Sequence, residues 1–271
     1  MAELPDNSVD LSIYSPPFAS LYTYSPSDRD LGNSANTDEF IEHYSFVLDH
    51  MLRVTKPGRT SAVHVQQVAI LKSRDGYVGL QDFRGRVIQA HLDAGFIYYG
   101  EVTVDKNPQL QAVRTKAQGL MFVQLRRDAA MSRPALADYV LIFHKPGDNE
   151  TPILPDISND TWIEWASPVW YGIPEMSTLN PGSGSEDADD RHICPLQLPL
   201  IERAVRLWSN PGELVLSPFA GIGSEGVVSV RHGRRFVGVE LKPSYWQTAV
   251  KNLEKAEAEA NLPSLFDEVV A

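Results

Sequence analysis

The sequence predicts an α/β fold in which a mostly parallel, twisted sheet carries helices on both faces. Segments with strand-like alternation and segments with helical spacing follow one another along the chain, as in folds built from parallel strands. From Glu213 to Glu240 the order is strand, glycine-rich turn, helix, and a second strand that ends in an acid, which is typical of a nucleotide-binding unit. With 271 residues, 43% of them apolar and 22% charged, the chain is expected to form one large domain, alone or with a smaller insertion.

The first predicted strand covers residues 8–14, where apolar residues alternate with smaller or more polar ones, and it runs into Ser15-Pro16-Pro17-Phe18. Proline donates no backbone N–H, so the strand must stop there. The rigid Pro-Pro step fixes the direction of the Ser15 hydroxyl and of the neighbouring carbonyls, and it holds the Phe18 ring beside them. The result is either a plain proline turn or a cluster of hydrogen-bond acceptors beside an aromatic platform.

Residues 21–104 are predicted to alternate between helix and strand after a polar surface loop. A loop is expected over 21–33, followed by a helix that has Thr37 as its N-cap and ends at Lys56-Pro57-Gly58. A strand over 62–65, a helix over 83–94 and a strand over 96–104 are expected after it. Gly95 follows the second helix where left-handed backbone geometry is favoured. His64 lies among apolar residues, which predicts a core histidine rather than a ligand.

The middle of the chain is basic although the whole protein carries a net charge of −11. Between Lys106 and Lys145 there are seven basic residues and two acids. Such clustering indicates either a solvated face or a nucleic-acid contact surface. Residues 105–134 are expected to be irregular, a buried strand is expected over 139–143, and no regular structure is predicted over 148–190.

The last third of the chain carries the clearest pattern. Helices are predicted over 198–208, from the glycine turn to residue 230 and over 243–260, and strands over 213–216 and 235–240. The turn Gly221-Ile222-Gly223-Ser224-Glu225-Gly226 allows a close approach of the backbone to a ligand, and Glu240 can accept hydrogen bonds from ribose hydroxyls. A nicotinamide dinucleotide and S-adenosylmethionine would both suit this geometry.

Composition excludes several classes of site. The single cysteine, Cys194, allows no internal disulfide and no CxxC motif, so no cysteine-based zinc or redox site is expected, and no other metal site is predicted. No apolar run approaches the roughly 20 residues that span a bilayer, and the N-terminus lacks the features of a signal peptide. The protein is therefore expected in the cytoplasm, without a membrane partner.

Taken together, the two motifs resemble those of the DNA amino-methyltransferases. That family has a catalytic [Asp/Asn/Ser]-Pro-Pro-[Tyr/Phe/Trp] tetrapeptide, here Ser15 to Phe18, and a Phe-x-Gly-x-Gly cofactor motif, here Phe219-Ala220-Gly221-Ile222-Gly223. The resemblance covers residues 4–58 and 192–252, and the order, catalytic motif first, is that of the beta group, including its phage-type members. It implies the methyltransferase version of the Rossmann-like fold in three parts: a catalytic half over 1–104, a target-recognition insertion over 105–190 that returns a core strand near 138–145, and a cofactor half over 191–271.

The resemblance also implies the site residues. The cofactor would be S-adenosyl-L-methionine, and its expected contacts are Phe219, Ala220, Gly221, Gly223, Ser224, Glu240, His192, Ile193, Cys194 and Pro195. Duplex DNA would be contacted by Lys106, Arg114, Lys116, Arg126, Arg127 and Arg133. Two departures from the family pattern stand out. The acid-bearing strand that usually precedes Leu4 is absent or replaced by another residue, and Gly-x-Gly-Ser-Glu stands for the commoner Gly-Ser-Gly-Thr-Thr.

The implied reaction is methylation of an exocyclic amino group on a base flipped out of the duplex. The Ser15 hydroxyl and the Pro16 carbonyl would accept the amine hydrogens while Phe18 stacks on the base, so neither a covalent intermediate nor a histidine partner for Ser15 is expected. Serine in the tetrapeptide favours cytosine N4 over adenine N6 by resemblance, whereas cytosine C5 chemistry would need a thiolate outside the cofactor segment.

Other functions stay open at this point. The alternatives are an RNA or protein amide methyltransferase, a nicotinamide-dependent oxidoreductase and a non-catalytic DNA-binding module. The cell is expected to be bacterial or phage-infected, with the enzyme in a restriction-modification setting. A homodimer is left open.

Overall fold

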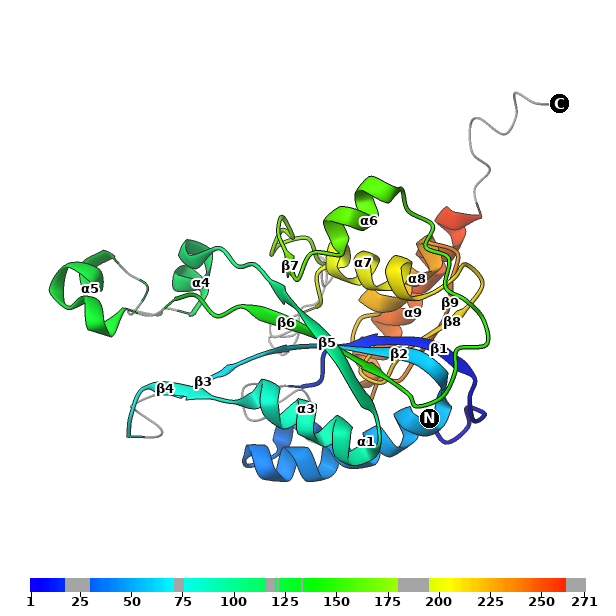
Figure 1. Cartoon of the computed structure of the whole chain (residues 1–271), viewed down its shortest axis with the longest axis horizontal. Helices are drawn as coiled ribbons and strands as arrows, with labels where there is room; N and C mark the ends of the chain where they lie inside the picture. Colours follow the sequence, from blue (N-terminus) through cyan, green and yellow to red (C-terminus); the bar gives the residue numbers. More distant parts are fainter. Residues whose placement is uncertain are drawn as a thin grey trace.

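A mixed sheet forms the centre of the protein (Figure 1). The computed structural model describes residues 1–17, 30–70, 76–115, 120, 122–132, 134–179 and 195–261, and within these residues the main sheet has seven strands in the order β7-β5-β6-β2-β1-β8-β9. Its strands are β1 (Val9–Tyr14), β2 (Thr55–Gln66), β5 (Ile97–Val104), β6 (Asp138–His144), β7 (Val169–Trp170), β8 (Leu214–Ser217) and β9 (Arg235–Gly238). Only β6 runs antiparallel to its neighbours, which confirms the predicted mostly parallel sheet.

Helices cover both faces of this sheet, as the sequence predicts (Figure 1). On one face lie α1 (Thr37–Val54) and α3 (Phe83–Ala94); on the other lie α7 (Leu198–Trp208) and α8 (Ser224–Arg231), with α9 (Pro243–Ala260) packed against α8. The side chains of β1 divide between two cores, and a register shift between Val9 and Leu11 moves Val9 out of the alternation. Val9 and Tyr14 pack with α1 and α3, whereas Leu11 and Ile13 pack with α7.

Several predicted helix boundaries are confirmed, but both predicted limits of one helix are wrong. Helices α3, α7 and α9 have the predicted limits, and Gly95 closes α3 with a φ of 103°. Helix α1, however, has Asn36 rather than Thr37 as its N-cap and ends at Val54 instead of at Lys56-Pro57-Gly58. Strand β2 begins at Thr55 because the chain pairs at once with β1, and the proline and glycine sit where the register between the two strands shifts.

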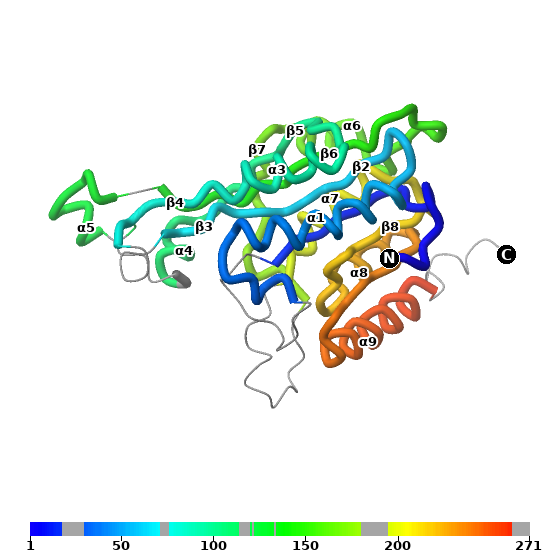
Figure 2. The backbone as a smooth tube through the Cα atoms, turned by 90° about the horizontal axis from the view of Figure 1, so that it is seen from below, coloured from blue at the N-terminus to red at the C-terminus, as the bar shows by residue number. Residues whose placement is uncertain are grey.

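Short elements extend from the end of the sheet at which β2 and β5 finish. They are the hairpin of β3 (Val68–Ile70) and β4 (Gly79–Gln81), α4 (Pro108–Thr115), α5 (Phe122–Arg127) and the 3-10 turn Ala129–Met131, and both views show the hairpin, α4 and α5 projecting to the same side (Figures 1 and 2). The prediction that 105–134 is irregular is therefore wrong over these two short helices. Helix α6 (Asn159–Trp165) and β7 likewise lie in the stretch for which no structure was predicted.

The predicted loop over 21–33 is described only from Asp30 onward. Leu31–Asn33 forms a 3-10 turn whose Leu31 and Gly32 are buried, so this part packs against the core rather than forming a surface loop. Residues 21–29 lie outside the described part. No helix in the described part of the chain is long and apolar enough to cross a membrane.

At the amino end of the central strands, a buried arginine connects β1, β2 and β8. Arg59 is 1% exposed, donates to the Asp10 carbonyl over 2.9 Å and pairs with Glu213. Asp10 in turn accepts a hydrogen bond of 2.9 Å from the backbone of Leu214. These contacts fix β1 beside β8 and thereby align the segments that follow both strands.

Candidate active site

The catalytic tetrapeptide and the glycine turn lie next to each other at one edge of the sheet. Strands β1 and β8 are parallel neighbours, with Ser12 opposite Leu216, so their carboxyl ends meet at the same edge. Ser15-Pro16-Pro17 follows β1, and Pro218-Phe219 follows β8. The Tyr14 and Phe219 rings are 5.8 Å apart between centroids, which brings the two segments together. Phe18 lies outside the described residues.

The turn after β8 has the backbone geometry that its glycines predict. Gly221 and Gly223 have φ angles of 52° and 88°, in the left-handed region where L side chains are strained. A Cβ on Gly223 would lie 3.2 Å from the Ala249 Cβ of α9, whereas a Cβ on Gly221 would meet no described atom within 4 Å. The backbone at Gly221 therefore borders open space, as a turn that receives a ligand requires, while Gly223 allows α9 to pack closely.

Glu240 lies directly at this turn, two residues after β9. One carboxylate oxygen accepts a 2.8 Å hydrogen bond from the Gly221 N–H, and the other accepts a 2.9 Å bond from the Lys242 N–H. Partial burial raises the pKa of the Glu240 carboxyl, while these backbone donors oppose the rise. A carboxylate oxygen can accept more than one hydrogen bond, so Glu240 can also accept from a ligand hydroxyl.

The end of β8 and the first turn of α8 flank the glycine turn in the sequence. Ser224 and Glu225 are buried, and burial, reinforced by the charge of Glu240, raises the pKa of Glu225 to about 8. The Ser217 hydroxyl is buried without a hydrogen-bond partner among the described residues. Pro195 is described and half-buried, whereas His192, Ile193 and Cys194 lie outside the described part. An unpartnered hydroxyl, an acid and an open glycine backbone together fit an adenosine-type cofactor.

A polar cluster that no sequence pattern indicated surrounds Ser15. The Ser15 hydroxyl lies 3.2 Å from both the backbone carbonyl and the Nδ1 atom of His64, and His64 Nε2 lies 3.0 Å from Asp138 Oδ2. Lys106 Nζ is 2.5 Å from the same Asp138 oxygen, and Gln66 Nε2 donates to the other over 2.8 Å. An acceptor role for Ser15 requires no histidine partner, yet His64, which is buried as predicted, contacts the motif.

The predicted DNA-contacting residues separate into different groups. Arg126 and Arg127 are exposed in the last turn of α5. Lys106 is only 6% exposed, and its charge is already paired with Asp138, so its assignment as a phosphate contact is corrected. Lys116 and Arg133 lie outside the described residues, as does the side chain of Arg114.

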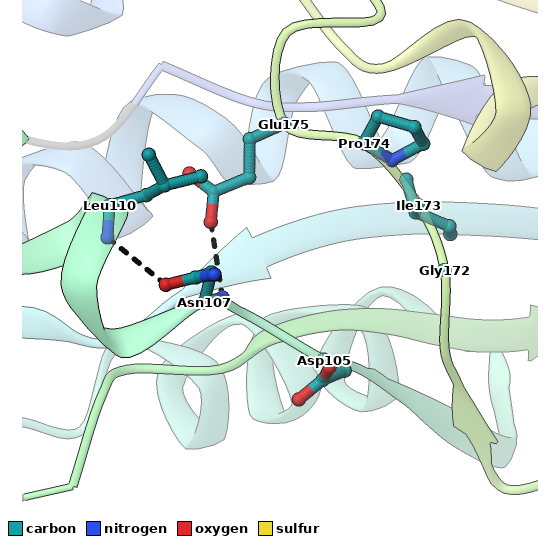
Figure 3. Close-up of a pocket in the computed structure, with 7 residues that line it drawn as sticks. All are labelled: Asp105, Asn107, Leu110, Gly172, Ile173, Pro174 and Glu175. Atoms are coloured by element: carbon teal, nitrogen blue, oxygen red, sulfur yellow. Dashed lines mark hydrogen bonds between the residues drawn. The ribbon is translucent and has the colours of Figure 1, made fainter.

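A cavity of about 280 Å³ opens farther along the same edge, where β5 and β7 end (Figure 3). Its lining residues are Asp105, Asn107, Leu110, Gly172, Ile173, Pro174 and Glu175. The Asn107 side chain accepts a 3.2 Å hydrogen bond from the Leu110 N–H, and Glu175 accepts one of 3.3 Å from the Asn107 N–H. The cavity is separated from β1 by β6 and β2, so it adjoins the segment expected to recognise the target rather than the glycine turn.

Sequence comparison identifies relatives of this chain. The family model described as DNA methylase matches residues 9–251. The type II methyltransferase M.BglI of Bacillus subtilis is 34% identical over 119 residues, covering 43% of this chain and 30% of the relative. The type II methyltransferase M2.DpnII of Streptococcus pneumoniae is 44% identical over 104 residues, covering 34% of this chain and 38% of the relative. The matched stretches thus span well under two thirds of these relatives.

Solved structures share the fold over nearly the whole chain. The protein TTHA0409 of Thermus thermophilus, in complex with S-adenosyl-L-methionine, superposes with a TM-score of 0.70 at 24% identity, covering 94% of this chain and 89% of that one. The PvuII DNA methyltransferase (cytosine-N4-specific) gives a TM-score of 0.64 at 18% identity, covering 96% and 87%. At these identities the likeness concerns the fold.

Proposed function

The chain belongs to the DNA methylase family, and from this membership we propose that it is an S-adenosylmethionine-dependent DNA amino-methyltransferase of the beta group. One observation carries the proposal. Because β1 and β8 are parallel neighbours, the tetrapeptide after one strand meets the glycine turn after the other, with the Tyr14 and Phe219 rings 5.8 Å apart. The tetrapeptide that would accept the substrate amine and the turn that would hold the methyl donor are thus side by side.

The residues after β8 and β9 would hold the cofactor. Glu240 would accept the ribose hydroxyls, the backbone at Gly221 would approach the ligand closely, and the buried Ser217 hydroxyl would gain the partner that it lacks among described residues. Pro195 and the neighbouring His192, Ile193 and Cys194 would line the methionine end. When bound, the cofactor supplies an electrophilic methyl group on a sulfonium.

The residues after β1 would act on the substrate. An exocyclic amine is a weak nucleophile because its lone pair is delocalised into the ring, and acceptors for its hydrogens restore the lone pair to nitrogen. The Ser15 hydroxyl and the Pro16 carbonyl would be these acceptors, and Phe18 would stack on the flipped base. Most of the rate would come from placement and from electrostatic stabilisation of the developing charge.

We favour cytosine N4 as the target, with adenine N6 as the alternative. The serine at the first tetrapeptide position supports cytosine, and the PvuII enzyme of the same fold is cytosine-N4-specific. The DNA adenine methyltransferase YhdJ of Escherichia coli (strain K12), 39% identical over 70 residues, keeps adenine as the alternative. Exposed Arg126 and Arg127 would contact phosphates of duplex DNA, in the cytoplasm of a bacterial or phage-infected cell.

The test is transfer of labelled methyl from S-adenosylmethionine to mixed-sequence duplex DNA, followed by digestion to nucleosides and mass analysis. We expect N4-methylcytosine, while N6-methyladenine would select the alternative base. Absence of any labelled nucleoside with protein that binds S-adenosylhomocysteine would refute the DNA reaction. Label on RNA or protein instead would identify the substrate polymer, and binding of NADH without S-adenosylhomocysteine would indicate an oxidoreductase.

A further inference from the structure

Ser15 begins a chain of four contacting side chains that continues through His64 and Asp138 to Lys106. His64 is near the carboxyl end of β2, Asp138 begins β6, and Lys106 follows β5 by two residues. Asp138 is opposite both Gln66 of β2 and Val104 of β5, so the antiparallel β6 brings its first residue to the edge where the other strands end. All three charged or titratable groups have side chains less than 10% exposed.

The contacts of Asp138 determine which nitrogen of His64 carries a proton. Burial raises the pKa of the Asp138 carboxyl, but His64 and then Lys106 lower it, and the net result is a pKa below the ordinary value. A carboxylate can only accept hydrogen bonds, so the His64 nitrogen 3.0 Å away, Nε2, must be the protonated one. In the neutral ring, Nδ1 then presents a lone pair to Ser15.

The same arrangement directs the Ser15 hydroxyl. Its hydrogen has two acceptors, the Nδ1 atom and the backbone carbonyl of His64, each 3.2 Å from the serine oxygen. With its hydrogen held toward β2, the serine oxygen keeps its lone pairs for a group that approaches from outside. Ser15 thus faces the substrate side as an acceptor, which is the role that an exocyclic amine requires.

We propose that His64 is a positioning residue for methyl transfer, which with Asp138 and Lys106 holds Ser15 as a hydrogen-bond acceptor and takes up the serine proton. This assignment rests on the proposed function. Once the substrate nitrogen has gained its fourth bond, its N–H bond breaks and the proton passes to Ser15 Oγ. The Ser15 O–H bond breaks at the same time, and that proton bonds to His64 Nδ1, giving an imidazolium whose Nε2–H faces Asp138. Water then removes the proton.

The imidazolium form of His64 cannot hold Ser15 as an acceptor. Protonated His64 carries hydrogen on both nitrogens, so Nδ1–H would donate to Ser15 Oγ and occupy a lone pair meant for the amine. Among the described residues, the charged group in contact with this imidazole is Asp138 of β6, which also pairs with Lys106 after β5. The neutral Ser15 contacts the imidazole from the segment after β1, and Gln66 of β2 donates to Asp138.

Two substitutions separate the parts of this role. His64→Leu removes both the acceptor and the proton store, whereas His64→Asn retains an acceptor near the Nδ1 position without the ability to take up a proton. We expect the single-turnover rate of His64→Leu to fall by about 100-fold, in the range for a lost proton-transfer partner. His64→Asn should recover part of that loss. S-adenosylhomocysteine affinity should stay within about twofold in both variants.

The matched control is His144→Asn at the opposite end of β6, where the ring stacks on Tyr99 at 3.9 Å. This variant should keep the wild-type rate. A second readout needs no turnover: nitrogen-15 NMR of the cofactor-free protein should find the neutral His64 ring protonated on Nε2.

A proton on Nδ1 would overturn the assignment. So would a wild-type rate in both His64 variants, or an equal loss of rate and cofactor affinity. If the wild type transfers methyl and the His64 variants do so at the same rate, the relay is refuted but the proposed function is not. Absence of transfer by the wild type refutes the proposed function, and the relay with it.

Discussion

Glu225, buried in the first turn of α8, makes stability depend on pH in a direction unusual for a carboxylate. Burial of its side chain, with the nearby charge of Glu240, raises its pKa from 4.5 to about 8. Between these values the folded protein retains a proton that the unfolded chain has already released. Stability from the protonated acid is therefore fully present at low pH and is lost as pH rises toward the folded value.

The size of the effect follows from the pKa difference. Each pH unit between the two pKa values lowers the free energy of unfolding by about 1.4 kcal/mol, so the whole interval corresponds to roughly 5 kcal/mol. Glu225→Gln keeps the size of the side chain but does not titrate. Relative to wild type, the variant should gain about 1.4 kcal/mol of stability per pH unit up to about pH 8 and no more above it.

Urea unfolding of both proteins from about pH 5.5 to pH 9 measures this difference, in which the titrations common to both proteins cancel. Glu257→Gln, at an exposed position of α9, is the matched control for removing one negative charge. A stability difference between Glu225→Gln and wild type that does not vary with pH would refute the reasoning, as would a variant that becomes relatively less stable at high pH.

Further substitutions test the glycine turn and the strand arrangement. Gly223→Ala combines a φ of 88° with a Cβ contact of 3.2 Å and should lower the free energy of unfolding by about 2 kcal/mol. Gly221→Ala should lower it by only about 1 kcal/mol but should weaken S-adenosylhomocysteine binding more than Gly223→Ala does. The reverse order in urea unfolding and calorimetric titration would contradict this. Arg59→Met removes the buried partner of Glu213 and should lower the free energy of unfolding by about 3 kcal/mol, with part recovered on adding Glu213→Gln. Near wild-type stability of Arg59→Met would show that the Arg59–Glu213 pair does not stabilise the fold.

Local signals predicted most of the fold. Helix α3 is bounded by Asp82, whose side chain caps its first turn, and by Gly95 in the left-handed region. The residues next to the helix therefore determine where it begins and ends. The start of β2 is different. Pro57 and Gly58 are local stop signals, but pairing of the following residues with β1 and β6 continues the strand across them, and only the tertiary partners reveal this.

Some features of the candidate site are likewise local in the sequence, and others depend on tertiary contacts. The tetrapeptide and the glycine turn are short sequence motifs, and strand order brings them together. The contacts of His64 with Ser15 and Asp138 join residues 49 and 74 positions apart, which no local pattern encodes. The available signal was that polar residues stand at the ends of predicted strands, since such ends gather at one edge of a parallel sheet. Lys106 was misassigned for the same reason, because a basic residue in a basic stretch gives no sign of a buried partner.

The role of Ser15 as an acceptor for the substrate amine is the central claim, and Ser15→Ala tests it most directly. The measurement is the single-turnover rate of methyl transfer to duplex DNA, with S-adenosylhomocysteine affinity determined on the same protein. Ser12→Ala, which loses a buried hydrogen bond of 2.9 Å to Ser61 on the neighbouring strand, is the control. We expect Ser15→Ala to reduce the rate by about 100-fold with affinity within about twofold, and Ser12→Ala to change neither. An unchanged rate in Ser15→Ala, or an equal loss of rate and affinity, would contradict the proposed role.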